Sequence, residues 1–401
     1  MINLKTLSEI SITTKSKIIM LVLDGLGGLP DPKSGKTELE TAITPNFDKL
    51  ARNGICGLSV PVSLGITPGS GAGHLALFGY DPLQFDIGRG ILEALGIDFP
   101  VEHCDVAARG NFCTVDNNSI ITDRRAGRIS TEKCTELCNL LEQIKIEGVE
   151  LFVRPVKEHR FLFVMRGEAL SDELTNTDPQ KAGYAPLKSE PKTEIAARSA
   201  AIVNEFVAKA SELLANHHPA NMLLLRGFSR KPDMLSFEDI YKLKSAAIAV
   251  YPMYRGLARL VGMDILNVDG TIKDQFDVLH DHYDKYDFFF IHIKKTDSAG
   301  EDGDFDRKVR VIEDVDQNLP QILDMKPDVL VVTGDHSTPA VMKGHSWHPV
   351  PFLLHSQYCR PDKATAFSES SCMEGSLSTF QAINIMPLAM ANALKLNKYG
   401  A

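Results

Sequence analysis

The chain has 401 residues, of which 44% are hydrophobic and 24% are charged, and its formal net charge is −9 at pH 7. This length and composition are typical of a globular protein with about two domains, and they exclude a disordered or fibrous chain. The negative charge argues against a general binder of nucleic acid or of anionic membranes. An anionic ligand would therefore need a local basic pocket.

The sequence predicts a cytoplasmic protein. It has no apolar run long enough to cross a membrane, and residues 1–17 lack the apolar stretch of a signal peptide. The seven cysteines are odd in number and include no C-x-x-C pair, which indicates free thiols in a reducing compartment. We expect no membrane partner, while the oligomeric state stays open.

The N-terminal part predicts a strand, a helix and a glycine-rich loop. Residues 17–25 form a continuous apolar run that finishes in Asp24, and residues 44–54 have the Thr-Pro start and terminal Gly of a helix. Residues 63–82 surround Ser70 with glycines just before an apolar run. Glycines let a backbone approach a ligand closely, so Ser70 is a candidate nucleophile.

The middle of the chain differs from both ends. It contains short alternating stretches, a polar Pro-rich passage and a long amphipathic helix pattern at residues 193–216. These features indicate an inserted α+β domain at residues 99–240. The core domain would then be discontinuous, with residues 1–98 and 241–401.

The C-terminal part repeats the pattern of the N-terminal part. Residues 286–297 and 328–337 are apolar runs that finish near Asp297 and Asp335, and residues 305–319 space apolar side chains at helical intervals. Such short continuous runs are typical of strands buried on both faces of a parallel sheet. The predicted fold class is therefore α/β, with a largely parallel sheet flanked by helices.

Three carboxylates should converge at one edge of this sheet, because ligands of parallel α/β sheets bind beyond the carboxyl ends of the strands. Carboxylates gathered in one place need cations. His336 follows Asp335 directly, and His345 lies in the next loop. Carboxylate and imidazole ligands suit Mn²⁺ or Zn²⁺ better than Mg²⁺ alone. We predict a two-metal site, where a bound cation would help the Ser70 hydroxyl to lose its proton.

Five motifs carry a resemblance to a known family: LVLDGLGG, TPGSGAGHLALFGYDP, KKTDSAGEDGDFD, TGDHSTP and HSWHPVPF. In this order they resemble the archaeal-type branch of the cofactor-independent phosphoglycerate mutases, in the alkaline phosphatase superfamily. The resemblance spans nearly the whole chain and implies an alkaline phosphatase-like core with an inserted substrate-binding lid. It also implies interconversion of 3-phosphoglycerate and 2-phosphoglycerate, in glycolysis and gluconeogenesis, through a phosphoserine on Ser70.

The resemblance further implies two divalent ions, with Mn²⁺ expected first and Zn²⁺, Mg²⁺ or Co²⁺ as alternatives. One ion would be held by Asp24, Ser70, Asp335 and His336, and the other by Asp297, Glu301 and His345. The family commonly has histidine where this chain has Glu301. A carboxylate there adds negative charge and favours a harder ion, and Asp302 is an alternative ligand.

Arginines are the side chains best suited to hold phosphate and carboxylate groups, because their geometry is bidentate. Family-like or glycine-flanked contexts single out five candidates for substrate binding, namely Arg89, Arg125, Arg128, Arg160 and Arg255.

Several other functions compete with the mutase. A metal-dependent phosphomonoesterase of the same superfamily would use the same core, whereas a sulfatase would need a C/S-x-P-x-R context that Ser70 lacks. A nucleotide-dependent kinase would need a phosphate-cradling loop, and no such loop is visible. A catalytically inactive binding protein is the fourth possibility, which the departure at Glu301 keeps open.

Overall fold

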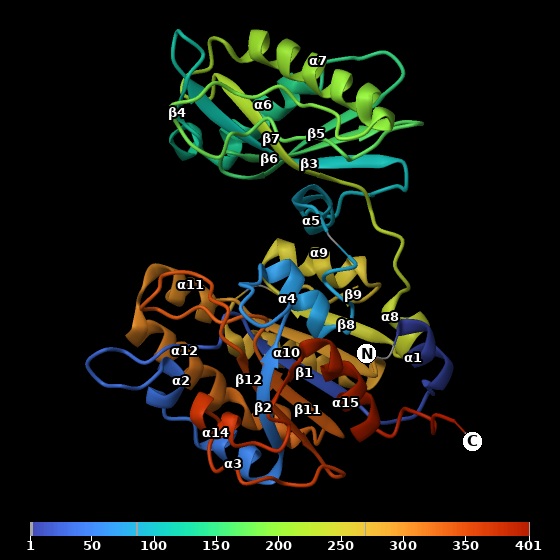
Figure 1. Cartoon of the computed structure of the whole chain (residues 1–401), viewed down its shortest axis with the longest axis vertical. Coiled ribbons are helices and arrows are strands. Elements are labelled where there is room, and N and C mark those ends of the chain that lie inside the picture. Colours follow the sequence, from blue (N-terminus) through green and yellow to red (C-terminus); the bar gives the residue numbers. More distant parts are fainter. Residues whose placement is uncertain (1–2, 86, 269, 401) are drawn as a thin grey trace. The chain divides into compact units, whose positions relative to one another are not determined.

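The computed structural model describes residues 3–85, 87–268 and 270–400 (Figure 1). The chain divides into a core unit, made of residues 1–86 and 234–401, and an inserted unit, made of residues 87–233. The sequence pattern predicts the insert at residues 99–240 instead.

Local packing accounts for the difference at both boundaries. Helix α5 (Arg89–Gly96) belongs to the inserted unit because Gly90 lies directly against the backbone of Ala107 in that unit. Helix α8 (Phe237–Tyr241) belongs to the core unit, where the rings of Phe237 and Phe288 lie 4.8 Å apart.

The core unit is built on an eight-stranded sheet. In sheet order its strands are β13 (Thr379–Gln381), β2 (Ile55–Val60), β12 (Val350–Ser356), β11 (Val329–Thr333), β1 (Ile18–Leu23), β10 (Phe288–Ile293), β8 (Ser245–Ala249) and β9 (Asp264–Ile265). Strand β1 pairs in parallel with β10 and β11, while β12 runs antiparallel to β11 and β2. All residues of β1, β10 and β11 are buried, which confirms the prediction of a largely parallel, doubly covered sheet.

Helices cover both faces of this sheet (Figure 1). Phe289 and Ile291 of β10 share one hydrophobic core with Phe276 of α10 (Ile272–His282) and Ile312 of α12 (Phe305–Asn318). The alternate residue Phe290 packs on the other face against Phe78, which directly follows α4 (Ser70–Leu77). No described helix is both long and apolar enough to span a membrane.

The helices of this unit besides α8 are α1 (Leu4–Ile10), α2 (Glu38–Thr41), α3 (Pro45–Asn53), α4 (Ser70–Leu77), α9 (Pro252–Leu260), α10 (Ile272–His282), α11 (Lys295–Asp302), α12 (Phe305–Asn318), α13 (Pro320–Asp324), α14 (Glu369–Met373) and α15 (Ile385–Asn392).

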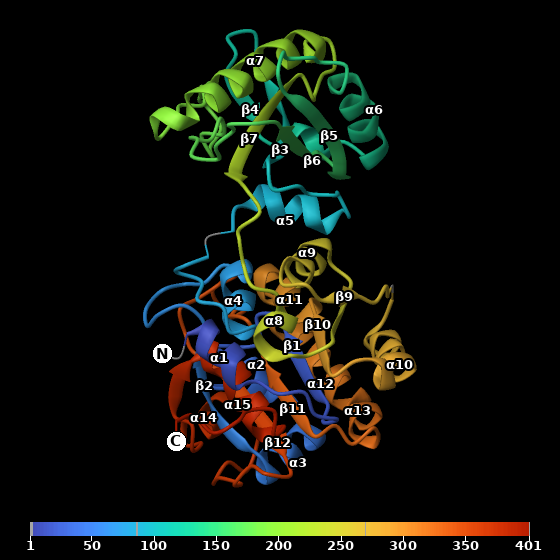
Figure 2. The same cartoon turned by 90° about the vertical axis from the view of Figure 1, so that its right-hand side faces the viewer.

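The inserted unit is an antiparallel α+β structure. Its strands are β3 (Asp105–Val115), β4 (Ile121–Asp123), β5 (Glu150–Lys157), β6 (Arg160–Arg166) and β7 (Met222–Ser229), and its longer helices besides α5 are α6 (Thr131–Leu141) and α7 (Ala197–Leu214). Helices α6 and α7 cover one face of the sheet and α5 lies on the other face (Figure 2). The amphipathic pattern at residues 193–216 thus forms α7, whose apolar side packs on the sheet.

Candidate active site

The ends of the central strands bring the predicted aspartates together. Asp24 directly follows β1 and Asp335 comes two residues after β11, and both are buried. Asp297 was expected to close β10, but that strand ends at Ile293 and Asp297 lies in the first turn of α11. Thr296 explains the difference, because its hydroxyl donates to the Asp24 carbonyl oxygen at 2.5 Å and fixes the start of this helix beside β1.

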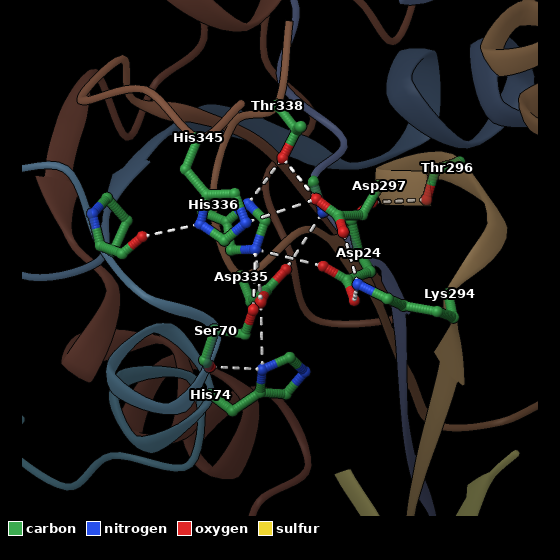
Figure 3. Close-up of polar contacts among 12 residues, drawn as sticks. Asp24, Ser70, His74, Lys294, Thr296, Asp297, Asp335, His336, Thr338 and His345 are labelled. Carbon is green, nitrogen blue, oxygen red and sulfur yellow. Dashed lines mark hydrogen bonds and ion pairs between the residues drawn. The ribbon is translucent and has the colours of Figure 1, made fainter. Parts of the chain in front are cut away.

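The first group of possible metal ligands consists of Asp24, Asp335 and His336. The Nε2 atom of His336 lies 3.2 Å from Asp24 Oδ1, 3.2 Å from Asp335 Oδ2 and 3.2 Å from Ser70 Oγ (Figure 3). Both carboxylate oxygens of Asp24 and Oδ2 of Asp335 are buried without a hydrogen bond among the described residues, although ion pairs reach them. Buried anionic oxygens of this kind fit a cation.

The second group consists of Asp297, His336 and His345. His345 Nε2 lies 3.6 Å from Asp297 Oδ1, and the rings of His336 and His345 stack at 3.6 Å. The Nδ1 atom of His345 lies 3.0 Å from the Pro68 carbonyl oxygen, which can only accept, so Nδ1 carries the proton. In the neutral ring Nε2 then keeps its lone pair, the form in which histidine binds metals.

Glu301 and Asp302 differ in their surroundings. Glu301 Oε1 lies 3.8 Å from His345 Nε2, just outside the tight second group, and its side chain is 54% exposed. Asp302 instead accepts a hydrogen bond from Arg307 at 2.6 Å. Glu301 is therefore the better placed of the two to complete this group.

The electrostatics of the first group favour ionised carboxylates. Burial alone would raise the pKa of Asp24, but the imidazoles of His292 and His336, each 3.2 Å from one of its carboxylate oxygens, outweigh burial and hold the pKa well below its usual value. Burial would likewise lower the pKa of His336, but Asp335 and Asp24 raise it to about 9. The site thus concentrates negative charge that attracts cations.

Lys294 is a functional candidate that the sequence analysis missed. Its Nζ lies 3.1 Å from Asp24 Oδ2 and pairs with Asp297 (Figure 3). It also lies 3.2 Å from the Tyr254 hydroxyl. Although burial opposes it, the two carboxylates raise the pKa of Lys294, so the amine stays charged. The signal in the sequence was a lysine that directly follows the apolar run of β10.

Ser70 occupies the first position of helix α4 rather than the predicted loop. Its side chain is partly exposed, so a substrate can reach it. His74, one turn later, has Nδ1 2.8 Å from the Ser70 carbonyl oxygen and 3.1 Å from Asp335 Oδ2. The carbonyl contact requires a proton on Nδ1, and His74 therefore orients this turn instead of binding metal through Nδ1.

Gly73 explains why this helix can begin beside the carboxylates. A Cβ at position 73 would collide with the backbone carbonyl of Asp335, so only glycine allows α4 to lie this close. The sequence predicts that the glycines allow close approach of a ligand, whereas the close neighbour of Gly73 is the backbone of Asp335.

We expect Gly73→Ala to push α4 away from Asp335 and to displace Ser70. The variant should lose about 1–3 kcal/mol of unfolding free energy, as overpacked cores do, and most of its catalytic activity. Gly69→Ala is the matched control, because a Cβ there meets open space. Denaturant unfolding and steady-state kinetics measure both effects, and equal behaviour of the two variants would contradict this explanation.

The inserted unit contains an arginine cluster, defined as Arg89, Arg109, Arg124 and Arg226. Arg109 of β3 lies directly opposite Arg226 of β7 in the register of the two strands, an arrangement that destabilises a sheet. Burial, together with Arg89 and Arg109, lowers the pKa of Arg226 to about 10. The guanidinium groups are thus close enough to repel one another.

Two carboxylates compensate part of this charge. Glu93 pairs with Arg109, and Asp178 accepts two hydrogen bonds from Arg124 at 2.6 and 3.1 Å. Positive charge still exceeds negative charge in the cluster. The buried Nε of Arg109 also makes no hydrogen bond within the described part of the chain. A bound anion would relieve both costs.

The five predicted substrate arginines occupy three places. Arg89 belongs to the arginine cluster. Arg125, Arg128 and Arg160 lie around His159, where burial and these charges lower the pKa of the imidazole to about 4. Arg255 lies on α9 of the core unit and donates to Asn267 Oδ1 at 3.0 Å. The sequence missed Arg109 and Arg226, although an arginine within an apolar strand was a usable signal.

Comparison with known proteins decides the family. Residues 51–221 match the family described as 2,3-bisphosphoglycerate-independent phosphoglycerate mutase. A relative from Aquifex aeolicus with the name "Probable 2,3-bisphosphoglycerate-independent phosphoglycerate mutase" is 52% identical, over 98% of this chain and 99% of that protein. The chain belongs to the 2,3-bisphosphoglycerate-independent phosphoglycerate mutase family.

Solved structures agree with this membership. The cofactor-independent phosphoglycerate mutase from Thermoplasma acidophilum is 31% identical to this family member, with a TM-score of 0.74 over 94% of this chain and 100% of that chain. A protein from Pyrococcus horikoshii is 30% identical, with a TM-score of 0.84 over 97% and 100% of the two chains. The resemblance read from the five motifs is therefore confirmed, and divalent metal dependence follows from the family.

Proposed function

We propose that this protein interconverts 3-phosphoglycerate and 2-phosphoglycerate by moving the phosphoryl group onto Ser70 and back. The observation that carries this proposal is the convergence of a partly exposed Ser70 hydroxyl with a buried, anionic cluster of carboxylates and imidazoles. An isolated serine is a poor nucleophile, and this setting is the kind that activates one.

We infer that two divalent ions bind here, with Mn²⁺ as the first expectation. Asp24, Ser70, Asp335 and His336 would hold one ion, and Asp297, Glu301 and His345 the other. When bound, the ions supply positive charge that lowers the pKa of a hydroxyl and offsets charge on the transferred phosphoryl group. The oxygen of Glu301 in place of an imidazole favours a harder ion, which supports Mn²⁺ or Mg²⁺ over Zn²⁺ at the second position.

The reaction consists of two phosphoryl transfers of opposite direction. In the first, the Ser70 hydroxyl gives up its proton, its oxygen forms a bond to phosphorus, and the bond from phosphorus to the substrate oxygen breaks. The substrate oxygen takes up a proton and becomes a hydroxyl. In the second, the neighbouring hydroxyl of the same glycerate gives up its proton and its oxygen forms a bond to phosphorus. The bond from phosphorus to the Ser70 oxygen breaks, and this oxygen takes up a proton to regenerate the Ser70 hydroxyl. The N-terminus of α4 favours the negative charge that the phosphoserine would carry.

Lys294 and the arginine cluster supply fixed positive charges in this proposal. Lys294 offers a third cation beside Asp24 and Asp297. The cluster in the inserted unit would hold the carboxylate or phosphate of the substrate, because it combines excess positive charge with buried donors.

We expect Arg226→Gln to raise KM for 3-phosphoglycerate by at least about 10-fold, because a buried charged partner of the anion is lost. The melting temperature should stay the same or rise, since Arg109 then faces a neutral side chain. Steady-state kinetics and thermal unfolding measure the two effects.

Arg198→Gln is the control for this prediction. Arg198 lies on α7 and donates to the Gly148 and Glu168 carbonyl oxygens, so its loss costs packing and leaves the cluster untouched. An unchanged KM in Arg226→Gln would show that the arginine cluster does not bind the substrate.

A direct assay tests the proposed function. Protein stripped with a chelator and reloaded with Mn²⁺ is given 3-phosphoglycerate without 2,3-bisphosphoglycerate, and 2-phosphoglycerate and free phosphate are followed in one sample. Conversion with little phosphate release supports the mutase. Phosphate release without conversion would instead identify a phosphomonoesterase, and parallel samples with Mg²⁺, Co²⁺ and Zn²⁺ identify the preferred ion.

A further inference from the structure

Thr338 lies between the two groups of possible metal ligands and contacts a member of each. Its Oγ1 lies 2.7 Å from Asp297 Oδ1 and 2.9 Å from His336 Nδ1 (Figure 3). The side chain is completely buried. This residue is not part of either predicted ligand set, and it follows His336 by only two positions.

Proton counting fixes the direction of both hydrogen bonds. The ionised Asp297 carboxylate can only accept, so the single hydroxyl proton of Thr338 is donated to it. The hydroxyl oxygen then has only lone pairs left, and the contact with His336 requires a proton on Nδ1. When the ring releases its second proton to bind a metal, Nδ1 keeps its proton and Nε2 becomes the binding atom. Nε2 is also the atom that faces Asp24, Asp335 and Ser70.

The backbone around Thr338 holds it in this place. Its N–H donates to the Gly25 and Gly27 carbonyl oxygens at 3.2 and 3.0 Å, and the buried Lys308 donates to its carbonyl oxygen at 2.9 Å. Lys308 also donates to the Gly27 carbonyl oxygen at 3.1 Å. The loop after β1 and the segment after β11 are therefore tied to each other at Thr338.

Two glycines give the Thr338 side chain its space. A Cβ at Gly25 would lie 2.5 Å from Thr338 Oγ1 and 2.9 Å from Asp297 Oδ1, and a Cβ at Gly300 would collide with the Thr338 carbonyl oxygen. Each glycine is a direct neighbour of a predicted ligand, Asp24 or Glu301. The segments that carry Asp24 and Glu301 can therefore lie against Thr338 because each has a glycine beside its predicted ligand.

We propose that Thr338 is a positioning residue that couples the two metal sites, because one hydroxyl orients Asp297 for one ion and fixes the His336 tautomer for the other. The inference rests on the proposed metal centre. Groups that orient metal ligands in this way typically contribute about 10–100-fold in metal affinity.

The test is calorimetric titration of the chelator-stripped full-length protein with Mn²⁺. Thr338→Val keeps the shape of the side chain and removes the hydroxyl, and we expect both binding steps to weaken by about 10–100-fold. Thr338→Ser restores the hydroxyl and should bind both ions with nearly wild-type affinity. Thr338→Ala provides a second hydroxyl-free variant if valine prevents folding.

Thr333→Val is the matched control for a loss of buried hydrogen bonding alone. Thr333 is also buried, and its hydroxyl donates to the Pro351 carbonyl oxygen at 2.9 Å rather than to a predicted ligand. We expect similar melting temperatures for Thr333→Val and Thr338→Val in chelator, but weakened Mn²⁺ binding only in the latter. A purely structural role would lower stability and leave the affinities of the folded protein unchanged.

The outcomes separate this inference from the proposed function. Wild-type protein that binds no Mn²⁺ would overturn the metal centre and the coupling with it. Wild-type protein that binds two ions, together with unchanged affinities in Thr338→Val and Thr338→Ala, would overturn the coupling alone. Weakening of only one step would show that Thr338 serves one site and would also contradict the coupling.

Discussion

Ser70→Ala should abolish interconversion of the phosphoglycerates, with a loss of at least about 10⁴-fold in kcat, as is typical when a nucleophile is removed. The reason is that, among the described residues, no other hydroxyl contacts His336 Nε2, the atom that also lies 3.2 Å from both carboxylates of the first group. A coupled spectrophotometric assay in both directions measures this loss.

Binding of Mn²⁺ should survive in the Ser70→Ala variant. The ligand atoms of Asp24, Asp335 and His336 come from other parts of the chain, so Mn²⁺ should still raise the melting temperature of Ser70→Ala. Ser63→Ala, an exposed position in the same stretch, should behave like the wild type. Activity within about tenfold of wild type in Ser70→Ala would exclude this serine as the phosphoryl carrier.

Asp335→Asn should remove the first metal site. Asp335 Oδ1 accepts the Gly25 N–H at 3.2 Å, a bond that asparagine can keep, whereas Oδ2 faces His74 and His336 and has no hydrogen bond among the described residues. Loss of this anionic oxygen should weaken Mn²⁺ binding by more than about 100-fold, beyond what a residue that only orients a ligand contributes.

The weaker Mn²⁺ binding of Asp335→Asn should reduce the stabilisation by Mn²⁺ as well as the activity. A ligand at about 1,000 times its Kd stabilises a protein by about 4 kcal/mol, so Mn²⁺ should raise the melting temperature of the wild type much more than that of Asp335→Asn. Asp328→Asn, at the opposite end of β11, is the control, because its carboxylate accepts only the backbone N–H of Lys17 there. Equal stabilisation of Asp335→Asn and wild type would show that the ion binds elsewhere.

The sequence predicted the core fold well because buried parallel strands leave an unmistakable pattern. The runs that became β1, β10 and β11 have no polar face, and a strand covered by helices on both sides is the structure that requires this. The boundary of the inserted unit was harder to predict. Helix α5 has the apolar pattern of a core helix, and only its contacts with β3, β6 and β7 assign it to the inserted unit.

The site was predictable where chemistry depends on residue type and strand order. Asp24 and Asp335 follow from strand ends, and the family motifs indicate His345 and Ser70. Thr338 and Lys294 were missed, because their importance lies in contacts between segments that are far apart in the sequence.

Two details of the prediction failed for local reasons. Ser70 begins a helix although its neighbours are glycines, which have poor helix propensity, because α4 gains close packing on Asp335. The arginine cluster depends on strand register, which places Arg109 opposite Arg226, and a single sequence does not reveal register.

Acid quenching during turnover is the most direct test of the central claim that Ser70 carries the phosphoryl group. The Mn²⁺-loaded enzyme is mixed with 3-phosphoglycerate labelled in its phosphate, quenched within one turnover and digested, and the peptides are analysed for label. We expect labelled phosphoserine at Ser70 that disappears as 2-phosphoglycerate forms. Rapid formation of 2-phosphoglycerate with no label on the protein, or with label at another residue, would contradict it.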